Sequence, residues 1–134
     1  MYEELKNFNI LYAEDDDYIR VQTTALLKIL FNKVYVAQDG IEALELFNLH
    51  HNELDVVVTD INMPKFCGID LAKHIKEKID TPIIAVSAYS KSDYELDDLE
   101  KIFSFYLRKP IQIKDLILNI EKAIKKEEGE FYLE

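Results

Sequence analysis

Five short apolar runs recur along the chain, and four of them stop at a polar group. The runs cover residues 10–13, 34–36, 56–59, 83–86 and 105–108. Runs of this length, bounded by polar residues, predict β-strands. The third run contains three consecutive valines, Val56 to Val58, which is typical of a central strand buried on both faces.

The segments between these runs carry apolar residues at helical spacing. The first helix is predicted over residues 16–31, and either Asp16 or Asp17 can cap its start. The fourth, over residues 92–103, is crowded with acidic side chains and has the least regular pattern. We expect the inward residues to be Ile19, Thr23, Leu26, Leu27 and Leu30 in the first helix, Ile41, Leu44 and Phe47 in the second, Ile69, Ala72 and Ile75 in the third, and Ile113, Leu116, Ile117, Ile120 and Ile124 in the last. The polar face of the last helix should carry Glu121, Lys122, Lys125 and Lys126.

Five strands alternating with five helices predict an α/β fold with a parallel sheet covered by helices on both faces. Right-handed crossovers restrict the connections to a few doubly wound orders. The chain has 134 residues, no internal repeat and no linker, so we expect one domain with one ordinary core.

Composition and charge exclude several classes of protein. The formal net charge of −10 and the lack of a basic patch argue against direct nucleic acid binding. Cys67 is the only cysteine, so no internal disulfide forms, and we expect a cytoplasmic location. No apolar run approaches the ~20 residues of a membrane helix, and the acidic start lacks the order of a signal peptide.

Chemically useful side chains follow four of the predicted strands. Glu14 and Asp15 follow the first, Asp60 the third, Ser87 the fourth and Lys109 the fifth. Sites in open α/β sheets lie outside the carboxyl ends of the strands, so these side chains should converge. Carboxylates suit Mg²⁺, while an ammonium and a hydroxyl suit phosphate oxygens. Asp16 and Asp17 are better explained as acids at a helix N-terminus.

Asp60 is the candidate for covalent chemistry within this set. A carboxylate can attack phosphorus and hold the phosphoryl group as an aspartyl phosphate. Phosphoryl transfer requires positioning and neutralisation of charge on the phosphoryl oxygens, which a metal ion and Lys109 would supply.

The arrangement resembles the receiver domain of bacterial two-component response regulators and is similar to the single-domain chemotaxis regulators in length. The resemblance runs from about Phe8 to Lys126. It rests on the acidic pair after the first strand, on Asp60 with its following Met63, Pro64 and Gly68, on Ser87, and on Tyr106 three residues before Lys109 and Pro110.

The resemblance implies a flavodoxin-like strand order 2-1-3-4-5 and a role for each site residue. Glu14, Asp15, Asp60 and the backbone carbonyl of Asn62 would bind Mg²⁺. Asp60 would accept the phosphoryl group, assisted by Lys109 and Ser87. Ser87 and Tyr106 would form the switch and shift inward on phosphorylation, and the peptide bond before Pro110 would be cis.

The resemblance also implies partners. A sensor histidine kinase or phosphotransfer protein would donate the phosphoryl group, and an output protein or fused output domain would respond. The chain would be a monomer or a weak dimer through helix 4, strand 5 and helix 5. It would not be an enzyme beyond catalysing its own phosphorylation and dephosphorylation. We expect residues 1–126 to form the receiver and residues 127–134 an acidic tail or the start of a linker.

Three departures from the family pattern affect these expectations. Ser87 stands where many members have Thr. Residues 101–104 lack the glycine that commonly precedes the fifth strand. Asn62 and Tyr89 occupy positions that flank the phosphoryl group, so the lifetime of that group is open.

Three alternatives remain. A haloacid-dehalogenase-like phosphohydrolase also uses a strand-end aspartate, but it needs a second aspartate where this chain has Asn62. A flavodoxin-like carrier would have a phosphate-binding loop in place of the acids after the first strand. A degenerate receiver, acting only as a binding module, would lack phosphorylation residues that are present here.

Overall fold

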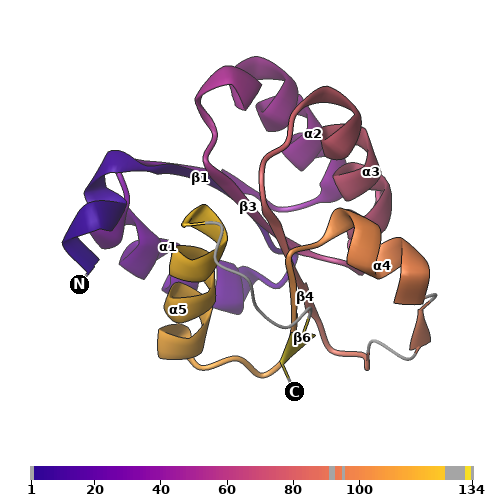
Figure 1. Ribbon diagram of the computed structural model, residues 1–134. Helices are drawn as coiled ribbons and strands as arrows, with labels where there is room; N and C mark the ends of the chain where they lie inside the picture. The colour runs from indigo at the N-terminus through magenta and orange to yellow at the C-terminus, as the bar shows by residue number, and fades with distance from the viewer. Residues whose placement is uncertain (1, 91–92, 95, 126–131, 134) are drawn as a thin grey trace.

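Five parallel strands form the centre of the molecule, with β1 in the interior of the sheet between β2 and β3 (Figure 1). The computed structural model describes residues 2–90, 93–94, 96–125 and 132–133. Its main strands are β1 (Asn9–Ala13), β2 (Lys33–Ala37), β3 (Val56–Asp60), β4 (Ile83–Ser87) and β5 (Phe105–Arg108). They pair in the order β2-β1-β3-β4-β5, and every pairing is parallel. The predicted doubly wound sheet and its flavodoxin-like order are therefore confirmed.

Helices cover both faces of this sheet, as predicted. The helices are α1 (Asp17–Leu30), α2 (Gly40–His50), α3 (Gly68–Lys78), α4 (Leu96–Ile102) and α5 (Ile113–Ile124). α1 and α5 lie on one face, and α2, α3 and α4 lie on the other (Figure 1). Two short 3-10 helices, η1 (Tyr2–Asn7) and η2 (His51–Glu53), were not predicted.

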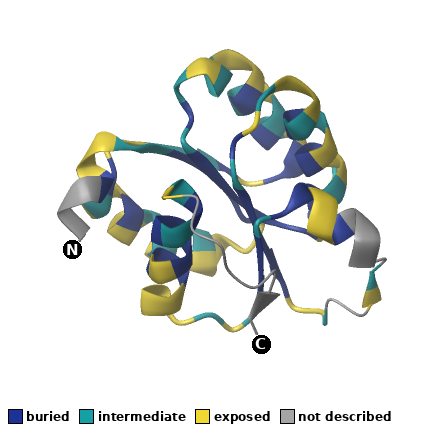
Figure 2. Cartoon of the chain, in the orientation of Figure 1, coloured by how far each residue is buried: buried dark blue, intermediate teal, exposed yellow. Residues whose placement is uncertain are grey.

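Two apolar cores result, one on each face of the sheet. In β1, Ile10 and Tyr12 pack toward α1 and α5, while Leu11 and Ala13 pack toward α2 and α3. All residues of β3 and β4 are buried, which Figure 2 shows as a dark blue centre. The three valines of β3 thus occupy the central strand that their lack of alternation predicts.

Aspartates cap the starts of α1 and α2, whereas α3 and α5 begin without a side-chain cap. Asp16 caps α1 by accepting the backbone N–H of Ile19 at 2.9 Å, and Asp39 caps α2 by accepting that of Glu42 at 2.8 Å.

Helix α4 starts at Leu96, later than predicted, and residues 91, 92 and 95 lie outside the described part. It ends without a left-handed residue, since Lys65 alone has positive φ among the described residues.

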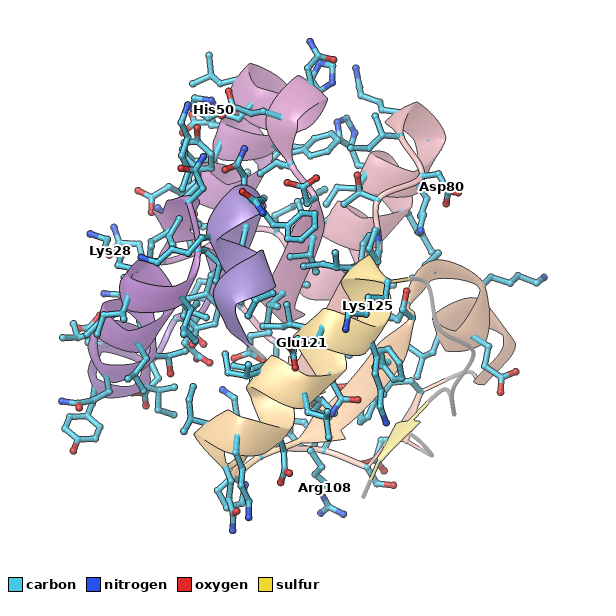
Figure 3. All side chains as sticks on the ribbon, turned by 60° about the vertical axis from the view of Figure 1, so that its left-hand side comes forward. Lys28, His50, Asp80, Arg108, Glu121 and Lys125 are labelled. Carbon is cyan, nitrogen blue, oxygen red and sulfur yellow. The ribbon has the colours of Figure 1, made fainter. Side chains whose placement is uncertain are left out.

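Some predicted helix faces were wrong. Ile41 is 39% exposed and Ile113 is 38% exposed, although both were expected to point inward. Glu121 was expected on the polar face of α5 but is buried, because it lies one helical turn after the buried Ile117. Lys125 is exposed as expected (Figure 3), and Lys126 lies outside the described residues.

A short sixth strand, β6 (Tyr132–Leu133), pairs in parallel with β5. It comes from the segment expected to be a tail or linker, and the rest of that segment, residues 127–131 and 134, lies outside the described part. No described helix is long and apolar enough to cross a membrane.

Candidate functional site

The carboxyl ends of the parallel strands bring the predicted site residues together. Asp60 is the last residue of β3 and pairs in register with Val86, so Ser87, the last residue of β4, lies one position further along. Glu14 follows β1 on the other side of β3. Lys109 follows β5, and its backbone N–H donates to the carbonyl of Ser87 at 2.8 Å. The convergence expected at this edge is confirmed.

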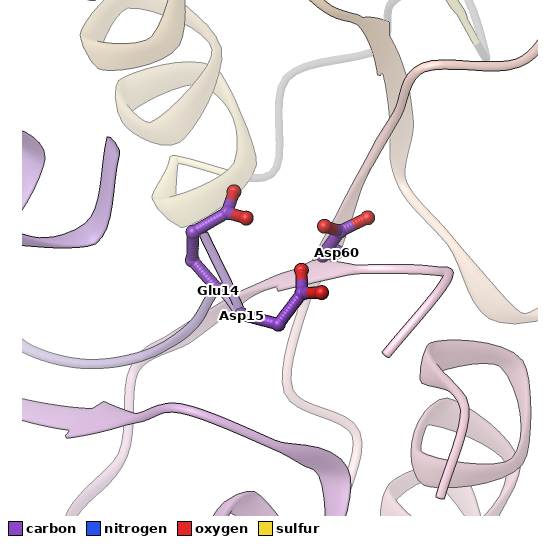
Figure 4. A group of neighbouring side chains, drawn as sticks. All are labelled: Glu14, Asp15 and Asp60. Carbon is purple, nitrogen blue, oxygen red and sulfur yellow. The ribbon is translucent and has the colours of Figure 1, made fainter. Parts of the chain in front are cut away.

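Three carboxyl groups gather at the centre of the site (Figure 4). One carboxylate oxygen from each of Glu14, Asp15 and Asp60 lies within 4.8 Å of the other two. Glu14 and Asp60 are buried, whereas Asp15 is exposed. Arg20 supports the segment after β1, because its guanidinium donates to the carbonyl of Glu14 at 3.0 Å. Sequence reasoning had not identified Arg20.

Lys109 supplies the positive charge of the site. Its Nζ lies 2.9 Å from Oδ2 of Asp60 and 3.0 Å from both carboxylate oxygens of Glu14. The peptide bond between Lys109 and Pro110 is cis, as the resemblance implied. The lysine therefore reaches two of the three acids directly.

The pKa is raised in both members of the central pair, but burial acts in opposite directions on the two. Burial raises the pKa of Asp60 to about 7; the hydrogen bond from Lys109 opposes this rise, and the nearby charge of Glu14 adds to it. Burial works against the ammonium of Lys109, but its hydrogen bond to Asp60 and the negative charges nearby raise the pKa of Lys109. The site therefore favours a bound cation, which relieves repulsion among the acids.

The loop after β3 is packed tightly against Asp60. A Cβ on Gly68 would lie 2.2 Å from the carbonyl oxygen of Asp60, so only glycine fits there. Lys65 has φ of 74°, and the N–H of Phe66 donates to the carbonyl of Pro64 at 2.8 Å, which closes a three-residue turn. Asn62 donates its backbone N–H to Oδ1 of Asp60 at 3.3 Å. A metal-binding role for the Asn62 carbonyl stays a prediction.

The two predicted switch residues are both fully buried. Ser87 Oγ accepts the backbone N–H of Tyr89 at 3.0 Å, and the hydroxyl of Tyr106 donates to the carbonyl of Tyr89. Both side chains therefore contact the same short segment after β4. Tyr106 is fully buried in this structure, and the shift of both switch residues on phosphorylation stays a prediction.

Sequence reasoning missed Tyr94, which we had placed only within a predicted helix. Its hydroxyl oxygen accepts a hydrogen bond from Asn62 Nδ2 at 2.8 Å and lies 3.2 Å from Ser87 Oγ. An aromatic residue in a strongly acidic segment, seven residues after Ser87, was the available signal.

The donor set fits a hard divalent cation. Mg²⁺ binds oxygen ligands, uses few carboxylates and keeps positions for water or phosphate oxygens. Glu14, Asp15 and Asp60 offer three such oxygens, with the exposed Asp15 facing solvent.

An apolar groove of about 800 Å³ opens beside the acids, between α1 and α5. Ile19 and Leu26 line it from α1, and Leu116 lines it from α5, and Glu14 and Lys109 of the acidic site line it as well. Ile19 and Leu26 were expected to be inward, yet they are 37% and 42% exposed because the groove separates the two helices.

Known proteins match this chain in sequence and in structure. The family model "Response regulator receiver domain" matches residues 10–121. The transcriptional regulatory protein PdtaR of Mycobacterium tuberculosis is 37% identical over 118 residues, which cover 87% of this chain and 57% of that protein. The receiver domain of the Francisella response regulator 1452 is similar in structure, with a TM-score of 0.78, 35% identity, and coverage of 90% of this chain and 98% of that one.

A further structural match is the CheX–CheY–BeF₃–Mg²⁺ complex of Borrelia burgdorferi, with a TM-score of 0.76 and 27% identity. That match covers 86% of this chain and 87% of the matched chain. The chain spans about half the length of the curated relatives, from 41% to 57%.

Proposed function

Because the chain belongs to the response regulator receiver domain family of two-component systems, we propose that it is a phosphorylation switch with Asp60 as phosphoacceptor. The observation that carries this assignment is the position of Asp60 at the end of β3, beside Lys109. It is a buried carboxylate at a strand end, held between the ammonium of Lys109 and two further acids. Placing these like charges together in a partly buried site is unfavourable for folding, and the degenerate-receiver alternative gives no functional reason for it.

The transfer needs only groups that surround Asp60. A carboxylate oxygen of Asp60 would attack the phosphorus of a phosphohistidine, the P–N bond would break, and the histidine nitrogen would leave with the electron pair and regain a proton. Lys109 would neutralise one phosphoryl oxygen, and the hydroxyl of Ser87 would donate to another. Glu14, Asp15, Asp60 and the Asn62 carbonyl would hold Mg²⁺, which supplies further charge neutralisation.

The phosphoryl donor would be a sensor histidine kinase or a phosphotransfer protein. The groove between α1 and α5 supports this, since Glu14 and Lys109 of the acidic site are among its lining residues and the rest of its lining is mostly apolar. A donor protein bound there would place its histidine over Asp60. A small donor such as acetyl phosphate would not need this surface.

The output would be a change of surface rather than a product. The switch residues contact the segment after β4, which leads into α4, and Tyr106 lies on β5. A partner protein or an attached domain would therefore read α4, β5 and α5, and a weak dimer would use the same face. β6 lies along the edge of β5, so its segment would meet any partner that binds there.

Labelling with a small phosphodonor tests the assignment. The chain is incubated with radiolabelled acetyl phosphate and Mg²⁺, and Asp60→Asn is compared with Asp80→Asn, a matched change at an exposed site. We expect label on the wild type and on Asp80→Asn, and none on Asp60→Asn. Equal labelling of Asp60→Asn would overturn the assignment, and rapid multiple turnover of a generic phosphate ester would favour the phosphohydrolase alternative.

A further inference from the structure

The phenol of Tyr94 lies at the centre of a hydrogen-bonded chain beside Asp60. Asn62 donates to its hydroxyl oxygen at 2.8 Å, and Ser87 Oγ lies 3.2 Å from the same oxygen. Asn62 follows β3 two residues after Asp60, and Ser87 ends the neighbouring strand β4. Tyr94 therefore joins side chains from two adjacent strand ends across the margin of the site.

Hydrogen-bond accounting orients the hydroxyl of Ser87. A phenol that accepts the Asn62 amide proton still has its own proton to donate, and Ser87 Oγ lies within reach. Ser87 Oγ also accepts the backbone N–H of Tyr89 at 3.0 Å. With both lone pairs of Oγ occupied, the proton of Ser87 remains available for an acceptor such as a phosphoryl oxygen on Asp60.

The same phenol occupies the side-chain amide of Asn62. The backbone N–H of Asn62 already donates to Oδ1 of Asp60 at 3.3 Å, so its side chain is anchored close to the phosphoacceptor. Asn62 is exposed, and a free amide there would bind water next to the phosphoryl group. Tyr94 therefore takes one of the two amide N–H donors of Asn62 away from this water.

Tyr94 also contacts the switch aromatic. The ring centroids of Tyr94 and Tyr106 are 6.3 Å apart with an interplanar angle of 59°. The hydroxyl of Tyr106 donates to the carbonyl of Tyr89, whose N–H binds Ser87. A single side chain thus contacts Asn62, Ser87 and Tyr106.

We propose that Tyr94 is a positioning residue that prolongs the lifetime of the aspartyl phosphate by holding Ser87 and Asn62. The inference rests on the proposed function of Asp60. In the hydrolysis that ends the signal, a water oxygen bonds to phosphorus, the bond between phosphorus and the Asp60 oxygen breaks, and inorganic phosphate leaves. The water proton passes to phosphate or solvent, and Asp60 is restored as a carboxylate. Tyr94 slows this step by keeping the Ser87 donor aligned and the Asn62 amide occupied.

Two variants separate the hydroxyl from the ring. Tyr94→Phe keeps the contact with Tyr106 and removes both hydrogen bonds, whereas Tyr94→Leu removes the ring as well. Tyr18→Phe is the matched control, since Tyr18 is 74% exposed on α1. Each chain is phosphorylated with acetyl phosphate and Mg²⁺, the donor is removed by rapid desalting, and release of inorganic phosphate is followed. The rate of uptake and the melting temperature are measured in parallel.

We expect Tyr94→Phe to release phosphate roughly three- to tenfold faster than the wild type, the range that one net hydrogen bond controls. Uptake should stay within about twofold, because charge neutralisation by Lys109 is unchanged. Tyr18→Phe should match the wild type. Decay of Tyr94→Phe at or below the wild-type rate would overturn the inference. So would a normal rate in Tyr94→Phe with a fast rate only in Tyr94→Leu, or a parallel change in uptake and decay, which would indicate general loosening.

Failure of the proposed function has a different signature. If the wild type takes up no label, or if Asp60→Asn is labelled equally, the phosphoacceptor assignment fails before Tyr94 is tested. If the wild type is labelled on Asp60 and Tyr94→Phe decays normally, only the role of Tyr94 is wrong.

Discussion

The ammonium nitrogen of Lys109 lies 2.9 Å from Oδ2 of Asp60. The lysine therefore binds the same carboxylate that a metal ion would also use. Lys109 and a divalent cation are therefore partners toward a phosphoryl group but competitors for the acids. A phosphoryl group on Asp60 would add the negative charge that lets both cations bind together.

This competition predicts that Lys109→Met separates metal binding from phosphorylation. Loss of the ammonium makes the site more negative, so Mg²⁺ should bind at least as tightly as in the wild type, by titration calorimetry. Uptake of phosphoryl groups should fall by roughly a hundredfold, which is the size of effect that loss of one charge stabiliser has in other sites. Lys28→Met makes the same charge change on the exposed side of α1 (Figure 3) and should alter neither. Weaker Mg²⁺ binding by Lys109→Met would contradict the competition.

The raised pKa of Asp60 predicts a pH-dependent stability difference. Its pKa is about 7 in the folded chain and near its ordinary value of 3.8 when unfolded, so the folded state binds the proton more tightly. This contribution favours folding fully below the ordinary pKa and is lost as the pH rises toward 7. Asn at this position has no proton to lose.

Asp60→Asn should therefore melt higher than the wild type at pH 8, by on the order of 5 °C without Mg²⁺, and the advantage should shrink toward pH 5. Calorimetric scans at several pH values measure this. Asp80→Asn, at an exposed position just after α3 (Figure 3), should show no such trend. A constant difference across pH would mean that Asp60 does not titrate in this range.

Metal binding should stabilise the fold through the three acids. Mg²⁺ binds the folded chain only, so it should raise the melting temperature of the wild type. The rise should be smaller at pH 6 than at pH 8, because protons compete for Asp60 below its pKa of about 7. Asp15→Asn should lose most of the response, and Asp17→Asn, an exposed acid paired with Arg20, should keep it. Equal loss of the Mg²⁺ response in both variants would mean that the response depends on the overall negative charge of this region and not on Asp15 as a ligand.

The groove between α1 and α5 predicts a difference between protein and small-molecule donors. Leu26→Glu places a charge in the apolar groove, so transfer from a phosphohistidine-carrying protein should fall roughly tenfold, the effect of about 1.4 kcal/mol of lost binding. Labelling by acetyl phosphate should be unchanged. Leu49→Glu, at a 74% exposed position on α2, is the control. Equal phosphoryl transfer to Leu26→Glu and Leu49→Glu would mean that the donor protein does not bind in this groove.

Much of the architecture follows directly from the sequence. The strand assignments agree with the structure to within about one residue, because short runs of β-branched residues such as Val56 to Val58 favour a strand that is covered on both faces. The convergence of Glu14, Asp60, Ser87 and Lys109 also follows from sequence order. Parallel strands present their carboxyl ends at one edge, so residues after each strand meet there.

Periodicity was less reliable for the helix faces. The stripe containing Ile19 and Leu26 predicted a covered α1, and the polar character of Glu121 predicted an exposed position. A helical pattern shows which residues share a side, but the distance to the neighbouring element decides whether that side is covered. α1 and α5 leave a groove between them, so the stripe on α1 is only partly covered. Glu121 lies one helical turn after the buried Ile117 in α5 and therefore faces the same buried side.

The sequence by itself determined the fold class, the strand order through family resemblance, and the set of acids, hydroxyl and ammonium at one edge of the sheet. Only the tertiary structure decided that Tyr94 joins Asn62 to Ser87 and that Arg20 supports Glu14. It also decided that Lys109 contacts two acids and that β6 lies beside β5. The physical reason is that periodicity and strand order depend on local spacing, whereas these contacts depend on loop paths and side-chain directions set by packing between distant segments.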